Sequence, residues 1–361
     1  MHLIVDAHED LAWNALSFGR DYTRSALETR QAEQNSVAPQ RNGNTLLGLP
    51  EYLEGRVAVI FSTLFVAPAR SANVTWETQN YSNAEEAHRA ANRQLDYYHR
   101  LADDNEQFKL IGGRGDLERV LGSWSGDDPA TRLVGLVPLM EGADPIREPQ
   151  EAEWWMERGI RIVGLAWAAT RYCGGTGEPG PLTPEGRRLL DVMAGLGLIL
   201  DLSHASDESF LEALDRFQGT VIVSHANPRA MLKDFPRPER MLTDEMIERV
   251  AEASGVIGVV PFNRFLKSAW RPADGKAAVT LSQVLDVIDH ICQVTGNAAH
   301  VGLGSDFDGG FGVEHVPAEI DTVANLQKLD AGLSARGYTD ADIAAILGLN
   351  WVEVLRRGLP A

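Results

Sequence analysis

Eight short apolar runs alternate with segments of helical periodicity along this chain of 361 residues. Runs that stay apolar, instead of alternating with polar residues, are expected of parallel strands covered on both faces. Their number and order predict a (β/α)8 barrel, or TIM barrel, and the alternative is an open doubly wound sheet. The runs lie at residues 3–5, 56–65, 133–140, 160–166, 197–204, 220–225, 255–260 and 300–306.

The size and composition of the chain suit one such barrel. Its apolar fraction of 44% is ordinary for a globular protein and can supply a large core. We therefore expect residues 1–361 to form a single barrel domain, with extra helices in the C-terminal tail after Ile320. The polar stretch from Phe18 to about Asn44 has little clear period, and we interpret it as a long connection or a lid.

The charge pattern limits the classes of partner. The net charge is −18, and the acidic residues are spread along the chain rather than gathered in a tail. This argues against a nucleic-acid backbone or an anionic membrane as a partner. The sequence shows no signal peptide and no apolar run near the roughly 20 residues that span a bilayer, so a cytoplasmic protein is expected. Cys173 and Cys292 suggest neither a disulfide framework nor a CxxC metal site.

Residues of metal-binding type stand at the ends of several of these runs. His8 and Asp10 are two residues apart at the end of the first run, so an extended chain directs both to one side. In a closed barrel the C-terminal ends of the strands meet at one mouth, where such enzymes place their sites. The candidates are His8, Asp10, Glu141, His204, His225 and Asp306.

One such residue alone is more often structural, but the whole set predicts a metal centre. Three histidines with several carboxylates are too many ligands for one tetrahedral zinc with an open position. They suit two ions about 3.5–4 Å apart, with Glu141 as the natural shared ligand and a bridging water of lowered pKa. Asp306 would stay off the ions as the acid and base. The ligand set lacks thiolate, so it allows zinc but also manganese, iron or cobalt.

Other polar residues have simpler interpretations. Asp201 and Asp308 lie beside the candidates, and we expect them to cap turns or to fix orientation. The remaining histidines stand on helices, in loops or at the wrong end of a strand, and we expect them to be structural or solvated. They are His2, His88, His99, His290, His300 and His315.

With these residues placed, the chain resembles the membrane (renal) dipeptidase family, binuclear zinc peptidases of the amidohydrolase superfamily. The resemblance covers nearly the whole chain and implies a barrel of the metallo-dependent hydrolase type. Its most specific segments read Asp-Leu-Ser-His and Gly-Ser-Asp-Phe-Asp-Gly. The matching segments are residues 6–11, 141–142, 201–204, 224–225, 302–309 and 346–351, together with Arg240.

The resemblance implies a role for each matched position. Asp306 matches the acid/base aspartate of the family. Arg240 matches the arginine that binds the C-terminal carboxylate of the substrate, and a guanidinium suits a carboxylate through two parallel hydrogen bonds. The implied zinc ligands are His8, Asp10 and Glu141 for one ion, and Glu141, His204 and His225 for the other.

Two positions depart from the family pattern. Trp167 stands where many members carry a histidine that contacts the scissile carbonyl, and an indole can neither ionise nor accept a hydrogen bond. Asn263 follows the seventh run, where some relatives have a tyrosine. We interpret both as substrate-binding positions that change the side-chain preference rather than metal binding.

The resemblance and the candidate residues predict a metallopeptidase, a zinc-dependent dipeptidase that hydrolyses L-L and L-D dipeptides through a hydroxide bridging two zinc ions. The metals would hold the developing oxyanion, and Asp306 would deliver a proton to the leaving amine. Trp167 and Asn263 also motivate an alternative, an amidohydrolase acting on N-acyl amino acids or related amides. A non-catalytic metal-binding relative is a further alternative. A homodimer would be usual for the resemblance.

Overall fold

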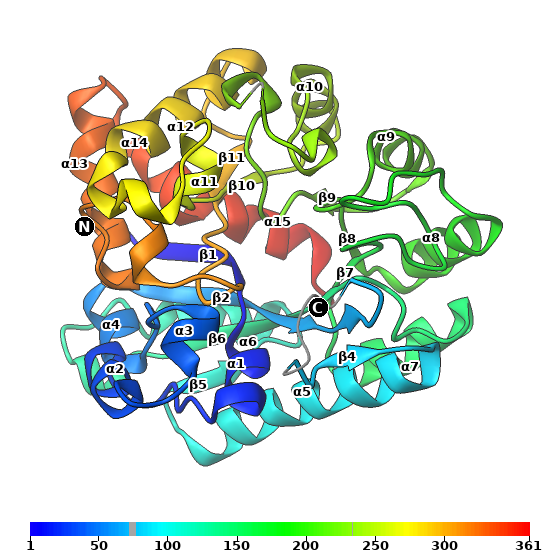
Figure 1. Cartoon of the computed structure of the whole chain (residues 1–361), viewed down its shortest axis with the longest axis horizontal. Helices are drawn as coiled ribbons and strands as arrows, with labels where there is room; N and C mark the ends of the chain where they lie inside the picture. Colours follow the sequence, from blue (N-terminus) through cyan, green and yellow to red (C-terminus); the bar gives the residue numbers. More distant parts are fainter. Residues whose placement is uncertain (72–76, 233) are drawn as a thin grey trace.

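The computed structural model describes residues 1–71, 77–232 and 234–361. Over these residues, eight parallel strands pair in the order β10-β11-β1-β2-β6-β7-β8-β9. A parallel bridge between Val223 and Ile257 joins the two ends of this order, so the strands form a nearly closed barrel with helices around it (Figure 1). The predicted (β/α)8 barrel is confirmed, and the alternative of an open doubly wound sheet is wrong.

The barrel strands are short and are buried almost throughout. Burial on both faces explains why each overlaps an apolar run of the sequence rather than an alternating one. The strands are β1 Ile4–Glu9, β2 Val57–Phe65, β6 Val134–Glu141, β7 Ile162–Gly164, β8 Ile199–Asp201, β9 Val221–Ile222, β10 Ile257–Val259 and β11 Val301–Leu303.

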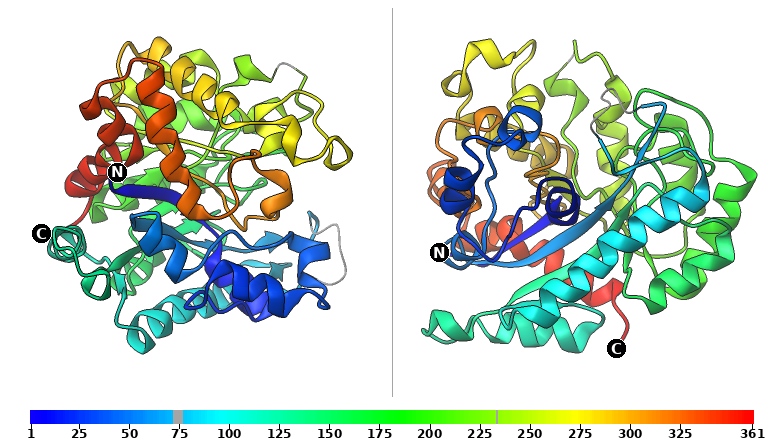
Figure 2. Two further views of the ribbon diagram at one scale, coloured as in Figure 1. Left: turned by 90° about the vertical axis from the view of Figure 1, so that its left-hand side faces the viewer. Right: turned by 60° about the horizontal axis from the view of Figure 1, so that its bottom comes forward.

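Helices follow most strands and cover the outside of the barrel, as Figure 2 shows for the long helix α5, in cyan. Thr183 caps α8 by accepting from the Gly186 N–H, and Pro184 is the first residue of that helix. Of the described helices, none joins the length to the apolar composition that a bilayer crossing needs. The α-helices are α1 Leu11–Phe18, α2 Ala26–Glu33, α3 Ala38–Asn42, α4 Leu49–Glu54, α5 Ala84–Asp104, α6 Arg114–Gly122, α7 Ala152–Glu157, α8 Pro184–Leu196, α9 Asp207–Arg216, α10 Asp244–Glu252, α11 Asn263–Leu266, α12 Leu281–Thr295, α13 Lys328–Ala335, α14 Asp340–Ala344 and α15 Asn350–Gly358.

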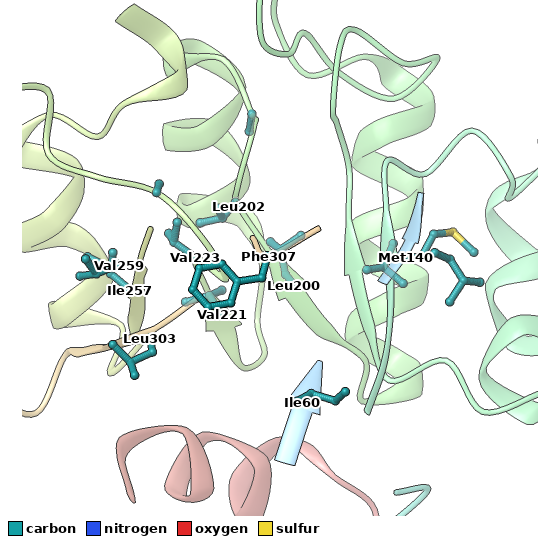
Figure 3. Close-up of a cluster of buried hydrophobic side chains, with 14 of the residues drawn as sticks. Ile60, Met140, Leu200, Leu202, Val221, Val223, Ile257, Val259, Leu303 and Phe307 are labelled. Atoms are coloured by element: carbon teal, nitrogen blue, oxygen red, sulfur yellow. The ribbon is translucent and has the colours of Figure 1, made fainter. Parts of the chain in front are cut away.

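The N-terminal end of the barrel is filled by its last helix. Trp351 of α15 packs edge-on against Phe61 of β2, with ring centroids 5.4 Å apart. At the other end of α15, Gly358 lies against Ile199, the first residue of β8. A larger cluster of apolar side chains packs the strands against the outer helices. Figure 3 shows the side chains of this cluster that come from β2, β6, β8, β9, β10 and β11 or closely follow them. The opposite end of the barrel is left for polar side chains.

A bulge in β1 sets the direction of the side chains at its end. Asp6 pairs with Ile60 of β2, whereas Glu9 pairs with Ser62, so the ladder register shifts between these pairs. Asp6 and Glu9 therefore share one face of the sheet. His8 turns to the other face, toward the interior of the barrel.

The polar stretch from Phe18 to Asn44 forms the helices α2 and α3 rather than a long irregular connection. Ser25 begins α2 with a capping box that involves Glu28. Arg20 holds the stretch in place by donating to Glu33 Oε1 and to Asp308 Oδ2, each at 3.0 Å. Where buried ion pairs hold a helix in place, apolar residues need not recur at helical spacing in the sequence. These helices were therefore not predicted.

Replacing Arg20 by methionine should lower the free energy of unfolding by about 3–5 kcal/mol, because it leaves the buried carboxylates of Glu33 and Asp308 without a cation to pair with. The side chains of Arg20 and Asp308 are both 0% exposed, so water cannot take over the pairing. Denaturation in urea measures the change. The matched control is Arg24→Met, whose ion pair with Asp21 is largely exposed and should matter little. Equal losses in both variants would contradict the proposed importance of the buried cluster.

Candidate metal centre

The candidate ligands, which come from five separate segments of the chain, meet at the C-terminal mouth of the barrel. Each comes at the end of a barrel strand or within three residues after it. Their ligand atoms form overlapping groups in which all atoms lie within 4.8 Å of one another. The groups are His8, Asp10 and Glu141; Glu141, His204 and His225; and His8, His225 and Asp306.

Glu141 stands between two of these groups. Its Oε1 lies 3.1 Å from His204 Nε2 and 3.5 Å from His225 Nε2. Its Oε2 lies 3.6 Å from His8 Nε2. One carboxylate thus offers a different oxygen to each group, which is the arrangement that a ligand shared by two ions requires.

The other separations are equally short. His8 Nε2 lies 3.7 Å from Asp10 Oδ2 and 3.9 Å from Asp306 Oδ1. The Nε2 atoms of His204 and His225 are 3.0 Å apart. Nitrogen and oxygen donors therefore surround a small space, and their chemistry suits zinc and other divalent first-row metals.

Polar atoms without partners show that the cluster fits a metal. His8 is fully buried, and among the described residues neither of its ring nitrogens has a hydrogen-bond partner. The same holds for Asp10 Oδ1. Burying such atoms costs free energy unless something binds them. A divalent cation bound by these nitrogen and oxygen atoms would satisfy them.

Burial and the neighbouring charges shift the pKa values of the three histidines in different directions. Burial lowers the pKa of His204 to about 4 and the pKa of His225 well below its ordinary value, and the charge of Arg240 adds to both shifts. Burial acts on His8 in the same direction, but the surrounding carboxylates, above all Glu141, outweigh it and raise the pKa of His8 to about 10. His204 and His225 are therefore neutral at neutral pH, the form in which imidazole binds a metal.

Hydrogen bonds behind two of the histidines fix their orientation. Ser224 Oγ donates to Asp201 Oδ2 at 2.5 Å and accepts from His225 Nδ1 at 2.8 Å. His204 Nδ1 lies 3.0 Å from the Thr176 hydroxyl. Because Nδ1 is occupied in each ring, Nε2 is directed at the cluster. Asp201 thus has the orienting position expected of it.

Asp306 is held beside the ligands by its backbone. Its φ of +57° lies in the left-handed region, as does the φ of +65° at His204. Gly309 leaves room for the side chain, since a Cβ there would lie 2.2 Å from Asp306 Oδ1 and 2.8 Å from Asp10 Oδ2. This close approach accounts for the last glycine of the Gly-Ser-Asp-Phe-Asp-Gly segment. Burial raises the pKa of Asp306 to about 7.

A cavity of about 700 Å³ opens onto the cluster. Asp10, Glu141 and Asp306 form part of its wall. Most of the remaining wall consists of aromatic and arginine side chains, contributed largely by residues 235–240 and 262–265. Its size and mixed lining suit a small-molecule substrate rather than a folded protein.

Arg240 and Trp167 both line this cavity. Arg240 is only 4% exposed and donates to the His225 carbonyl at 2.9 Å. Within the described part of the chain it forms no ion pair, and burial lowers its pKa. A buried guanidinium in this state favours an incoming carboxylate. The Trp167 ring lies beside His204, with centroids 6.2 Å apart.

Asn263 lies apart from the other candidates. It is fully buried at the start of α11 and does not belong to the described residues that line the cavity, although Phe262 and Arg264 do. Both polar atoms of its side chain lack a hydrogen-bond partner among the described residues. Its contact with a substrate therefore stays a prediction.

Comparison with known proteins identifies the family. The profile described as membrane dipeptidase, peptidase family M19, matches residues 1–358. The chain belongs to the membrane dipeptidase family. It is a metallopeptidase, and its cluster of histidines and carboxylates could hold the metal that such a peptidase uses.

Relatives of this membrane dipeptidase family member carry dipeptidase names. An uncharacterised dipeptidase of Schizosaccharomyces pombe is 32% identical over 369 residues, which cover 98% of this chain and 80% of that protein. The dipeptidase tcpJ of Claviceps purpurea is 26% identical over 324 residues, covering 85% and 68%. A metallopeptidase of Rhodobacter sphaeroides, liganded with a phosphinate mimic of the dipeptide L-Ala-D-Ala, shares the fold with a TM-score of 0.78 at 23% identity over 99% of both chains.

Sequence reasoning missed several residues of this dipeptidase site. Thr176 orients His204 from a glycine- and proline-rich loop, a segment type whose path no periodicity predicts. Trp13 and Phe65 also line the cavity. The sequence analysis placed Phe65 only in the run 56–65 and did not single out Trp13. The position of Trp13, one helical turn after Asp10, is the signal that could have found it.

Proposed function

We propose that the protein is a zinc-dependent dipeptidase with two zinc ions per chain, hydrolysing small dipeptides of L-L and L-D configuration. The observation that carries this proposal is the geometry of Glu141. One of its oxygens lies 3.1 Å from His204 Nε2, and the other lies 3.6 Å from His8 Nε2. A shared carboxylate at the mouth of a barrel favours a two-metal hydrolase over a site with one ion.

The ligand groups divide naturally between two ions. When bound, the pair would supply a water of lowered pKa and would polarise the carbonyl oxygen of the substrate. Zinc is our proposal for the metal, and metal analysis of the purified protein tests it against manganese, iron and cobalt. We propose His8, Asp10 and Glu141 as ligands of one ion, and Glu141, His204 and His225 as ligands of the other.

The remaining side chains bind the dipeptide and move protons. The Arg240 guanidinium can take the C-terminal carboxylate through two parallel hydrogen bonds, because it is buried in the cavity wall and forms no ion pair among the described residues. Asp306 shares that wall with Glu141. At its carboxylate it can accept the proton of the attacking water and give it to the leaving nitrogen. Trp167 lines the cavity beside His204, where its ring can contact the substrate.

A panel of L-L and L-D dipeptides, assayed with the zinc-loaded protein, tests the proposed function. We expect hydrolysis of dipeptides and little hydrolysis of tripeptides, because Arg240 binds a carboxylate one residue from the scissile bond. The phosphinate mimic of L-Ala-D-Ala bound to the Rhodobacter sphaeroides protein supports including D-residues at the second position. Cleavage of longer peptides or esters, with no dipeptide cleaved, would refute the proposal.

Replacing Arg240 by methionine should lower kcat/KM for dipeptides about 10²-fold, since it removes charge-assisted hydrogen bonds to the carboxylate. Dipeptide amides, which have no C-terminal carboxylate, are the matched control substrates. For them the variant and the parent protein should differ much less. An equal loss on both kinds of substrate would show that the substitution damages the site rather than removing carboxylate binding.

An aromatic wall favours one alternative function. Trp13, Phe65 and Trp167 all line the cavity, and the Phe65 and Trp167 rings lie 5.0 Å apart. Such a wall would also accept the acyl group of an N-acyl amino acid, whose carboxylate Arg240 could equally bind. Greater kcat/KM on acylated amino acids than on dipeptides would favour this amidohydrolase. Bound metal without turnover on either class would indicate a non-catalytic relative.

A further inference from the structure

The active-site cavity carries more cationic side chains than a dipeptide backbone needs. Four arginines line this cavity beside five carboxylates. Asp10, Glu141 and Asp306 belong to the ligand groups, Asp308 pairs with Arg20, and Glu77 accepts from Trp13. A dipeptide with an uncharged side chain presents one carboxylate, and the proposed function assigns it to Arg240. The lining arginines are Arg41, Arg237, Arg240 and Arg264.

Arg237 and Arg264 lie on the same side of the cavity as Arg240. Arg237 directly precedes the short 3-10 helix Pro238–Arg240. Arg264 belongs to α11 and directly precedes Phe265, whose ring centroid lies 5.2 Å from Arg240 Cζ. Phe235 packs edge-on against Phe265 at 5.4 Å, so the two segments are in contact. The two additional arginines therefore lie beside the position proposed for the C-terminal residue of the substrate.

Neither of these two arginines has an acidic partner among the residues that the structure describes. Within the described residues, neither Arg237 nor Arg264 forms an ion pair, and both are exposed at the cavity wall. Arg229, by contrast, lies 2.6 Å from an oxygen of Asp207. Exposed arginines in a cavity that are not used internally are available to an anionic group of a ligand.

A second hollow gives a side chain room to reach Arg264. It has a volume of about 590 Å³, and Arg264, Phe262 and Phe311 are among the residues that it shares with the wall of the first cavity. One carboxylate, Asp234, and a further arginine, Arg271, also line it. The Phe262 and Phe311 rings stack with centroids 4.3 Å apart and an interplanar angle of 13°. They form a flat apolar floor between the two spaces, with a guanidinium at its edge. A side chain of methylene groups ending in a carboxylate could lie on the two rings and reach the guanidinium with its charged end.

We propose that the residue on the C-terminal side of the scissile bond carries an acidic side chain, which Arg264 binds while Arg237 adds to the positive field. This inference rests on the proposed function and names the substrate class within it. Glutamate fits better than aspartate, because its longer side chain extends across the floor of Phe262 and Phe311. The bound substrate would then use Arg240 for its main-chain carboxylate and Arg264 for its side-chain carboxylate.

The test compares acids with their uncharged amides on the zinc-loaded protein. We expect kcat/KM for Ala-Glu to exceed that for Ala-Gln at least tenfold, and the Ala-Asp to Ala-Asn ratio to be smaller, in whichever configuration of the second residue is cleaved. Arg264→Gln should bring the Ala-Glu to Ala-Gln ratio close to one. The matched control, Lys267→Gln, removes a positive charge just after the same helix but outside both hollows, and should keep the ratio.

Each outcome decides one part of the inference. Equal rates on Ala-Glu and Ala-Gln would overturn the acidic preference while leaving the proposed dipeptidase intact. An unchanged ratio in Arg264→Gln would overturn the role of that arginine. If no dipeptide is cleaved, the proposed function fails, and calorimetry with free glutamate and glutamine decides the preference separately. Binding of glutamate at least tenfold tighter than glutamine would support an acid subsite, and equal binding would overturn it.

Discussion

Replacing Asp306 by asparagine should lower kcat for dipeptides about 10²–10⁴-fold while the protein keeps its metal, because a positioned acid and base is lost without a change of shape. The carboxylate lies 3.9 Å from His8 Nε2, and its left-handed backbone and the space at Gly309 hold it there. An amide of the same size occupies that position but can neither accept the proton of the attacking water nor supply one to the leaving nitrogen.

Two measurements separate this role from a structural one. Metal content should be the same in Asp306→Asn and the parent protein, and thermal unfolding should be similar. The loss should also be smaller for an ester analogue of the same dipeptide, whose oxygen leaving group departs with less help from a proton. Loss of metal from the variant would instead make Asp306 a ligand, which its membership of the group with His8 and His225 permits on geometry alone.

The barrel was predictable because each of its strands leaves a recognisable pattern in its own short stretch of sequence. A parallel strand buried on both faces must be apolar along its length, so each strand of the barrel overlaps a run visible in the sequence. The helices α2 and α3 were missed because a buried cluster of Arg20, Glu33 and Asp308 stabilises them instead of an apolar face. The three short strands β3 Ala67–Pro68, β4 Asn80–Tyr81 and β5 Phe108–Leu110 contain Pro68, Asn80 and Lys109, so none of them forms a continuous apolar run that the sequence would show.

The candidate ligands were predictable for a similar reason. Topology brings the C-terminal ends of barrel strands to one mouth, so a histidine or carboxylate just after a strand is placed without knowledge of side-chain packing. Asn263 and Arg264 show where this rule stops. They lie on a four-residue helix whose position depends on the packing of Phe235, Phe262 and Phe265. Sequence could not tell that Arg264 faces the cavity and that Asn263 is buried behind it.

The hydrogen bonds that orient the ligands were predictable only in part. The Asp-Leu-Ser-His segment places Asp201 three residues before His204, and the sequence analysis expected Asp201 to fix orientation. The structure shows that Asp201 orients His225, through Ser224 of the neighbouring strand end. Such a contact depends on the register between β8 and β9, which pair Asp201 with Ile222. The register between two strands depends on how both pack in the fold, so it cannot be predicted from the sequence of either strand alone.

Replacing Glu141 by glutamine should have the widest effect on the metal centre, reducing the bound zinc from the two proposed ions per chain to one or none. The parent carboxylate directs Oε1 to His204 and Oε2 to His8, at 3.1 and 3.6 Å. A glutamine keeps one oxygen but replaces the other by an NH₂ group, which donates hydrogen bonds and cannot bind a cation. Loss of the shared ligand should lower kcat about 10³-fold or more, since several kcal/mol of transition-state stabilisation depend on the ions.

Asp144→Asn is the matched control for this prediction, because Asp144 is a buried carboxylate in the loop that follows the same strand. Its oxygens accept from Tyr81 and Arg171 and belong to none of the ligand groups among the described residues. Elemental analysis of the two dialysed variants should find zinc lost from Glu141→Gln and retained in Asp144→Asn. Two ions retained by Glu141→Gln would mean that the histidines and Asp10 hold the metals without a shared carboxylate. In that case the central geometric support for a two-metal dipeptidase would fail, whatever activity the variant keeps.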